Sequence, residues 1–157
     1  DSDTLVNKIR YMVKALDVEF VFVDHISMLA SGFEGKDERR EIDNIMTKLR
    51  SLVEELEIAL IIVSHLKRPE GKSHEEGGRT TLAQLRGSQS IAQLSDMVIS
   101  FERDQQDELV SNLTTVRVLK NRFSGECGKT CTLSYDKETG RLQEVDDFTD
   151  TKQPSFK

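Results

Sequence analysis

Two unbroken apolar runs, separated by one long amphipathic segment, constrain the fold of this chain more than any other feature. The first run is Phe20–Val23, which ends at Asp24, and the second is Leu60–Ser64, which ends at His65. An unbroken run, unlike an alternating one, is typical of a strand that is buried on both faces. Between the runs, apolar residues recur at helical spacing from about Asp37 to Leu56. A strand, a helix and a strand of this length predict a βαβ unit with parallel strands.

The rest of the chain extends this pattern at both ends. A first helix is predicted from the spacing of Leu5, Ile9, Met12, Val13 and Leu16, with Asp3 or Thr4 as its cap. Residues 31–37 and 66–81 are polar and glycine-bearing, and so long an irregular stretch as the second is usually functional or mobile. A short helix over 88–94 and a further strand over 97–101 are expected next.

Beyond Leu113 the pattern alternates and then frays. From Leu113 the pattern places Val116 and Val118 on one face and Arg117 and Leu119 on the other. Cys131, Leu133 and Tyr135 alternate again, and Asp136–Gly140 supplies a turn before Leu142. These features predict antiparallel strands added to the parallel sheet. We therefore expect an α/β fold in a single domain over residues 1–145, followed by an acidic, polar, flexible tail over 146–157.

Composition limits the classes of protein that remain. The 157 residues have a net charge of −6, whereas proteins that coat nucleic acid by charge alone are usually basic. Any contact with DNA must therefore use a local patch. No apolar run approaches the roughly 20 residues that span a bilayer, and no signal segment begins the chain, so we expect a cytoplasmic protein without membrane contact. The two cysteines, Cys127 and Cys131, are too few for a disulfide framework or a zinc site.

Asp24 and His65 are the first candidates for chemistry, because ligands of open α/β sheets bind at the carboxyl ends of the strands. An aspartate after four apolar residues has the form of a Walker B strand, whose carboxylate holds Mg²⁺ through a water molecule. Two other interpretations stay open on this pattern alone. Asp24 could cap a turn, and His65 could be an ordinary core histidine.

A phosphate-binding loop is absent from these residues. Such a loop needs Gly, four residues, and then Gly-Lys-Ser/Thr, so that backbone amides wrap the phosphates. Gly71-Lys72-Ser73 would need a glycine at Leu66, and Gly128-Lys129-Thr130 would need one at Phe123. Gly35-Lys36 is followed by Asp37. All three stretches fail the pattern.

Taken in order, short motifs over about residues 4–145 resemble the helicase domain of podophage bifunctional primase–helicases, relatives of DnaB and of mitochondrial Twinkle. The most specific are Leu85-Arg86-Gly87-Ser88, Gln93-Leu94-Ser95-Asp96 and Leu119-Lys120-Asn121-Arg122-Phe123. Val23-Asp24-His25-Ile26-Ser27, Ser64-His65-Leu66-Lys67 and His74-Glu75-Glu76-Gly77 also match. The resemblance implies the later part of a RecA-like, P-loop NTPase fold.

The resemblance also implies catalytic roles. Asp24 is expected to order Mg²⁺ as the Walker B carboxylate, and His65 to sense the γ-phosphate. Lys120 and Arg122 are expected to reach the nucleotide of the neighbouring subunit, with Arg122 as the arginine finger. Positions two apart on a strand share a face, which agrees with such a pair. The alternative for the pair is a solvated strand edge that opposes aggregation.

Further residues are implied in nucleotide and DNA binding. Arg103 and Tyr135 resemble residues that sandwich the base, and Gln93 resembles one that links the nucleotide to the DNA-facing segment; simple surface packing is the alternative. The resemblance assigns single-stranded DNA contacts in the channel of a ring to Lys67, Arg68, Lys72, Arg86 and Gly87, with a charged mobile loop as the alternative. Ala92 stands where phage relatives can have a basic residue.

The expected function is that of a hexameric or heptameric ring helicase that couples hydrolysis of ATP or dTTP, with Mg²⁺, to 5′–3′ translocation on single-stranded DNA. A primase fused upstream and a replicative polymerase docked on the tail are the expected partners, in the host cytoplasm if the protein is phage-encoded. The family's P-loop and catalytic glutamate would lie before residue 1. We therefore expect the chain alone to fold without a cofactor but to be inactive. The alternatives are a non-catalytic RecA-like module for assembly or DNA binding, and a RecA- or KaiC-like ATPase.

Overall fold

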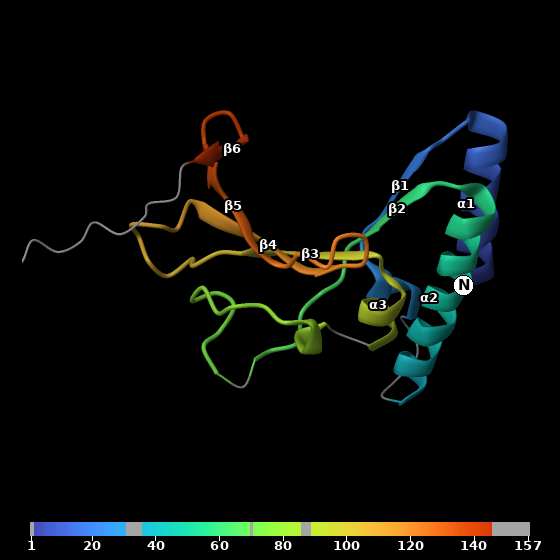
Figure 1. Ribbon diagram of the computed structural model, residues 1–157, viewed down its shortest axis with the longest axis horizontal. Helices are drawn as coiled ribbons and strands as arrows, with labels where there is room; N and C mark the ends of the chain where they lie inside the picture. The colour runs from blue at the N-terminus through green and yellow to red at the C-terminus, as the bar shows by residue number, and fades with distance from the viewer. Residues whose placement is uncertain (1, 31–35, 70, 86–88, 146–157) are drawn as a thin grey trace, which may run out of the picture. The chain divides into compact units, whose positions relative to one another are not determined.

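The structure, a computed structural model, describes residues 2–30, 36–69, 71–85 and 89–145. It divides into two compact units (Figure 1). Unit 1 consists of Asp1–Arg68 and Thr81–Asp96, and unit 2 of Pro69–Thr80 and Met97–Lys157.

Unit 1 contains the predicted strand–helix–strand arrangement. Helix α1 (Ser2–Leu16) precedes β1 (Phe20–Val23), a 3₁₀ helix η1 (Ile26–Ala30), α2 (Lys36–Leu56) and β2 (Ala59–Ile62). The 3₁₀ helix η2 (Leu82–Gln84) and helix α3 (Gln89–Leu94) follow. Strands β1 and β2 are parallel and in register from Phe20↔Ala59 to Val23↔Ile62. The βαβ prediction is confirmed.

The two long helices of unit 1 end in the same way. Asp17 and Glu57 follow α1 and α2 with φ values of 57° and 55°, and their amides bond the carbonyl oxygens of Val13 and Val53. A left-handed residue at this position closes the last turn and sends the chain out of the helix. Each helix is therefore followed within a few residues by its strand.

The core of unit 1 lies around the apolar stripe of α2. The predicted residues Ile42, Ile45, Leu49 and Leu52 are at most 1% exposed, and Ile9 of α1 is fully buried. The spacing of these four residues places them on one side of the helix. Unit 1 is therefore organised around α2.

Ion pairs join the neighbours of α2 to it. Arg10 of α1 binds Glu55 at 2.7 Å, and Arg50 binds Asp96, just after α3, at 2.6 Å. Pairs this exposed contribute little stability individually, so they orient elements that the apolar stripe already holds.

One prediction about the strands is wrong. Val21 is 6% exposed, but Phe20 and Phe22 are 64% and 72% exposed, so β1 is covered on one face only. Helices α1 and α2 both lie on the same side of the β1–β2 pair (Figure 1). The unbroken apolar run indicates covered faces on both sides, and the described residues supply a cover for only one of them.

Unit 2 is built on a four-stranded antiparallel sheet in the order β3-β4-β5-β6. Its strands are β3 (Met97–Glu102), β4 (Leu113–Asn121), β5 (Gly128–Tyr135) and β6 (Leu142–Val145). The predicted turn before β6 forms because Asp136 accepts hydrogen bonds from Glu138 and Thr139, while Gly140 adopts a φ of 69°. The antiparallel strands are confirmed, but among the described residues they pair with one another in a separate sheet and are not added to the β1–β2 pair.

Glu102 and Arg117 form a largely buried ion pair in unit 2. Their side chains are 7% and 16% exposed and approach to 3.0 Å across β3 and β4. Glu102 also accepts the backbone N–H of Thr80 at 2.8 Å. Burial disfavours the carboxylate, but these hydrogen bonds outweigh it and hold the pKa of Glu102 below its usual range.

Three further sequence predictions concern membrane crossing, the loop and tail segments, and the number of domains. Among the described residues, every helix is too short or too polar to cross a bilayer. The tail over 146–157 and the loop over 31–35 lie outside the described residues. The single domain over 1–145 stays a prediction.

Candidate functional site

The carboxyl ends of β1 and β2 bring the first two candidates to one edge of the sheet. The backbone pairing continues past both strands, because Val63 donates to Val23 at 2.9 Å and Ile26 donates to Val63 at 3.1 Å. The residues after β1 therefore run beside those after β2. Asp24 and His65, which follow the two strands, are both exposed. Their predicted roles stay predictions.

His25 lies beside this edge and had no predicted role. Its ring meets the ring of His65 edge to face, with centroids 4.0 Å apart and planes at 86°. In the described part of the chain, the buried atoms His25 Nδ1 and Ser27 Oγ have no hydrogen-bond partner. Buried polar atoms are usually paired, so two unpaired ones beside Asp24 mark this edge as unusual.

A magnesium ion at this edge stays a prediction, for which the edge supplies one carboxylate. The described residues contain no group of three or more His, Cys, Asp or Glu side chains that could hold a metal ion. Magnesium commonly keeps several waters and uses one or two carboxylates together with substrate phosphates. The exposed carboxylate of Asp24 is one ligand of that kind.

A polar groove of about 570 Å³ lies on unit 1 and includes two further candidates. Lys67 and Gln93 both line it, so the structure brings a predicted DNA contact and the predicted linking residue together. The backbone amide of Lys67 donates to Gln84 at 2.7 Å, which fixes the start of its loop. The other residues of the lining are Arg39, Asp43, Thr47, Gln89, Ser90 and Leu94.

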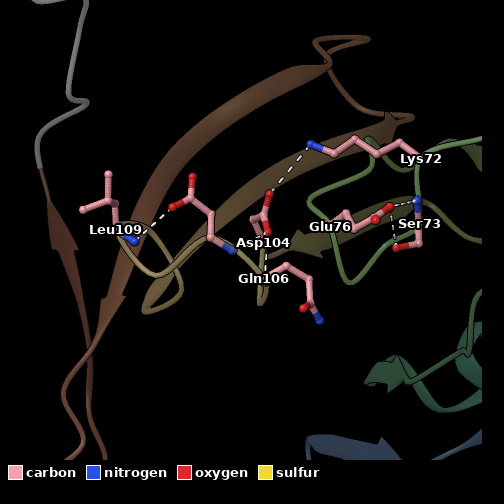
Figure 2. Close-up of polar contacts among 7 residues, drawn as sticks. Lys72, Ser73, Glu76, Asp104, Gln106 and Leu109 are labelled. Carbon is pink, nitrogen blue, oxygen red and sulfur yellow. Dashed lines mark hydrogen bonds and ion pairs between the residues drawn. The ribbon is translucent and has the colours of Figure 1, made fainter.

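The remaining predicted DNA contacts lie elsewhere. Arg68 is exposed at the end of the first segment of unit 1, whereas Lys72 belongs to unit 2. Lys72 lies 3.7 Å from a carboxylate oxygen of Asp104 (Figure 2). Arg86 and Gly87 lie outside the described residues.

Arg103 and Tyr135 both bond the residues just before β4, at one end of the antiparallel sheet. The guanidinium of Arg103 donates to the carbonyl oxygen of Ser111. The backbone N–H of Tyr135 donates to the next residue, Asn112, at 2.8 Å. Residues 111–112 therefore lie between the two candidates. Arg103 is half-buried and Tyr135 is 37% exposed, so part of each remains open to a ligand.

Lys120 and Arg122 are found at the opposite end of β4, and one expectation about them is wrong. Strand β4 ends at Asn121, so Arg122 lies in the following turn and strand alternation does not relate the two side chains. Asn121 ends the strand because its Oδ1 accepts the amides of Phe123 and Ser124 at 3.0 and 3.2 Å. An Asn side chain that bonds the backbone two residues on is a common way to start a turn. The catalytic role of the pair stays a prediction.

Comparison with known protein families shows which family the chain belongs to. The model of the family described as "DnaB-like helicase C terminal domain" matches residues 1–144. The chain belongs to the DnaB-like helicase C-terminal domain family.

Individual relatives of this DnaB-like chain agree with the family. The DNA helicase/primase of Enterobacteria phage T3 is 42% identical over 144 residues, which are 91% of this chain and 25% of that protein. The chain thus spans a quarter of the length of this relative.

Solved structures bear on the fold alone. A DnaB-like replicative helicase, whose structure was described together with its interactions with primase, matches with a TM-score of 0.73 and 22% identity over 93% of this chain and 35% of that chain. A KaiC-like protein from Pyrococcus horikoshii OT3 matches with a TM-score of 0.64 and 16% identity, over 93% of this chain and 57% of that chain. The predicted RecA-like α/β fold is confirmed.

The groove of the DnaB-like chain also contains residues for which no role was predicted. Arg39, Asp43 and Thr47 line the groove from α2 at intervals of four, the spacing that places side chains on one face of a helix. That polar face was visible beside the apolar stripe. His25 directly follows Asp24 at a strand end, but nothing local indicates its contact with His65.

Proposed function

We propose that this chain is the part of a replicative ring helicase that completes the nucleotide site, donates a finger to the next subunit and contacts single-stranded DNA. The intact protein would couple hydrolysis of ATP or dTTP to 5′–3′ translocation and duplex unwinding. The observation that supports it most directly is the shared edge after β1 and β2, where Asp24 and His65 follow neighbouring parallel strands. Ligands of open α/β sheets bind at this edge.

Each residue at this edge has a distinct task in the proposal. Asp24 would hold Mg²⁺ through a water, and the ion would neutralise charge on the phosphates. His65 would donate a hydrogen bond to the γ-phosphate. The ring of His25 would limit how the His65 ring can turn, because the two meet edge to face. Loss of the γ-phosphate would then change the position of His65 and, with it, that of the residues that follow, including Lys67.

The length of β4 supports a finger that acts on a neighbouring subunit. Arg103 and Tyr135 flank the residues before β4, whereas Lys120 and Arg122 lie at its other end. The nine residues of β4 extend roughly 26 Å at about 3.3 Å per residue. One nucleotide whose base is stacked between Arg103 and Tyr135 would therefore not also reach Arg122.

The DNA-binding part of the proposal is carried by cations on loops rather than by the net charge. Lys67, Arg68 and Lys72 are all exposed, and Arg86 and Gly87 would add a second contact. Several subunits in a ring would concentrate these cations around one strand of DNA, which compensates for an acidic chain.

The proposed partners follow from the relatives. The T3 protein is named a helicase/primase, and the solved DnaB-like helicase was described with primase, so we include a primase partner, fused or separate. A hexameric or heptameric ring, a polymerase docked on residues 146–157 and a cytoplasmic site of action complete the proposal.

Turnover tests the enzymatic proposal. The 157-residue chain, incubated with ATP or dTTP, Mg²⁺ and single-stranded DNA, should release no phosphate, because it contains no P-loop sequence. A longer polypeptide that joins a P-loop segment to this chain should hydrolyse nucleotide, and Asp24→Asn should abolish that activity. Turnover that survives Asp24→Asn would exclude the proposed role of Asp24. An assembly that binds DNA without turnover would favour the non-catalytic module.

Mixed rings test the finger. Arg122→Ala should lower the rate by about 10³–10⁵, the range for an arginine finger. Rings mixed from Asp24→Asn and Arg122→Ala subunits should regain activity, since an intact Arg122 on one subunit would face an intact Asp24 site on the next. No recovery in mixed rings would show that Arg122 does not act across the interface.

A further inference from the structure

The loop Pro69–Thr80, which includes the proposed DNA contact Lys72, is held by the last residue of β3 and by the turn that follows it. At its end, the backbone N–H of Thr80 donates to Glu102 at 2.8 Å. In its middle, the carbonyl oxygen of Glu75 accepts the backbone N–H of Gln105 at 2.8 Å. The loop is thus fixed by two hydrogen bonds to residues 102–105 within unit 2.

Internal contacts give the loop a defined shape. Glu76 accepts hydrogen bonds from the amide and hydroxyl of Ser73 at 3.1 and 3.0 Å (Figure 2). The amide of Gly78 returns to the carbonyl oxygen of Ser73 at 2.9 Å. Lys72, which precedes this turn, therefore projects from an ordered backbone rather than from a random loop.

Asp104 uses its two carboxylate oxygens differently. Oδ1 accepts the amides of Gln106 and Asp107 at 3.0 and 3.1 Å, which closes the turn after β3. Oδ2 faces the ammonium of Lys72 at 3.7 Å (Figure 2). The backbone also brings the two segments together, since a Cβ added to Gly77 would lie 3.0 Å from the Cβ of Asp104.

We propose that Asp104 sets the affinity of this loop for single-stranded DNA by competing with the phosphodiester backbone for the ammonium of Lys72. The Lys72 side chain is 64% exposed and that of Asp104 is 24% exposed, so a phosphate can approach the lysine from the solvent side. The carboxylate already neutralises part of the charge of the lysine and repels a phosphate that approaches it, so the two anions compete for the ammonium. Asp104 is in this sense a positioning residue that acts through Lys72, and the inference rests on the proposed DNA contact of Lys72.

The chain offers a matched pair of substitutions. Asp104→Asn keeps an oxygen that can accept the amides of Gln106 and Asp107 but removes the charge facing Lys72. Asp107→Asn also keeps an acceptor, here for the amide of Leu109 at 3.0 Å, and changes the net charge by the same amount. Of these two aspartates, Asp104 is the one that faces Lys72. Only the Asp104→Asn variant therefore removes a charge from beside that lysine.

Binding of labelled oligothymidylate to the full chain, followed by fluorescence anisotropy, tests the inference. At low salt Asp104→Asn should bind about two- to fivefold more tightly than Asp107→Asn, the range expected for an exposed ion pair. The difference should shrink at high salt. In a Lys72→Met background the difference in affinity between the two variants should disappear, because there is then no ammonium for Asp104 and the phosphate to compete for.

The outcomes separate this inference from the proposed function. If Lys72→Met weakens binding but the two Asp→Asn variants bind alike, Asp104 does not compete, although the DNA contact stands. If Lys72→Met leaves binding unchanged, the proposed DNA contact fails and the inference falls with it. A purely structural role of Asp104 would instead weaken binding in Asp104→Asn, even in the Lys72→Met background.

Discussion

The imidazole rings of His25 and His65 meet edge to face, with 4.0 Å between their centroids, at the ends of two neighbouring parallel strands. The contact joins the residue after Asp24 to the predicted phosphate sensor. It therefore ties the position of one proposed nucleotide-binding residue to that of the other.

Replacing His25 tests how much this contact contributes. His25→Ala should lower the free energy of unfolding by about 1–2 kcal/mol, because an edge-to-face pair adds roughly 0.5–1.5 kcal/mol beyond the burial of its area. His25→Phe should retain most of the stability. Urea denaturation followed by circular dichroism measures both variants, with the exposed Tyr11→Ala as a control. Equal losses for Ala and Phe would mean that the ring contact contributes nothing.

The buried pair of Glu102 and Arg117 should make the stability of the protein depend on pH. Because the pKa of Glu102 is lowered on folding, its contribution is fully present above the unfolded value of about 4.3 and is lost as the pH falls through the lower folded value. Glu102→Gln should therefore flatten the acid limb of a stability–pH profile.

The same variant should be destabilised at neutral pH. Removing one partner of a buried pair costs about 3 kcal/mol. Glu55→Gln, which breaks the more exposed pair with Arg10, should cost at most about 1 kcal/mol. Similar losses for the two variants at pH 7 would contradict the importance that we assign to burial.

Two glycines of the loop Pro69–Thr80 should differ sharply in their tolerance of a side chain. A Cβ at Gly78 would collide with the carbonyl oxygen of Lys72 and lie 2.7 Å from that of Ser73, whereas a Cβ at Gly71 would meet nothing within 4 Å. Gly78→Ala should therefore open the loop, and Gly71→Ala should not. Hydrogen exchange of the Gly77 and residue-78 amides measures the opening. Unchanged protection in Gly78→Ala would show that the loop adjusts without cost.

Lys67 should contribute to DNA binding through its charge. Lys67→Met should weaken binding of oligothymidylate and lower the salt dependence by about one phosphate contact. Lys8→Met on α1 removes the same charge from an exposed position outside the groove and should have little effect. If the two variants weaken binding equally, net charge and not the groove determines the affinity.

Local patterns predicted most of the secondary structure because the signals were local. The stripe from Ile42 to Leu52 identified α2, and the alternation after Leu113 identified β4. The error at β1 has a different origin. The run Phe20–Val23 reports a preference for apolar surroundings on both faces, and the described residues supply them on one.

Contacts between residues distant in sequence could not be predicted in this way. Lys72 and Asp104 are 32 positions apart in the sequence (104 − 72). His25 and His65, whose rings are in contact, are 40 positions apart (65 − 25). Resemblance to a family suggested roles for Lys72 and His65 but not their partners. The end of β4 was missed for another reason, since the turn depends on the side chain of Asn121 and not on hydrophobic alternation.

In the proposed ring, the length of β4 would set the distance between two consecutive nucleotides. The base of one nucleotide would bind at one end of the strand, and Arg122 at the other end would reach the next nucleotide. Removing two residues from its middle would keep every remaining side chain on its original face and shorten the strand by about 6.6 Å. Such a deletion should leave each subunit folded and able to bind a base, but it should prevent Arg122 from reaching the nucleotide of the next subunit. If the finger acts in this way, the number of residues in β4 sets the distance between a base and the finger that serves the next nucleotide.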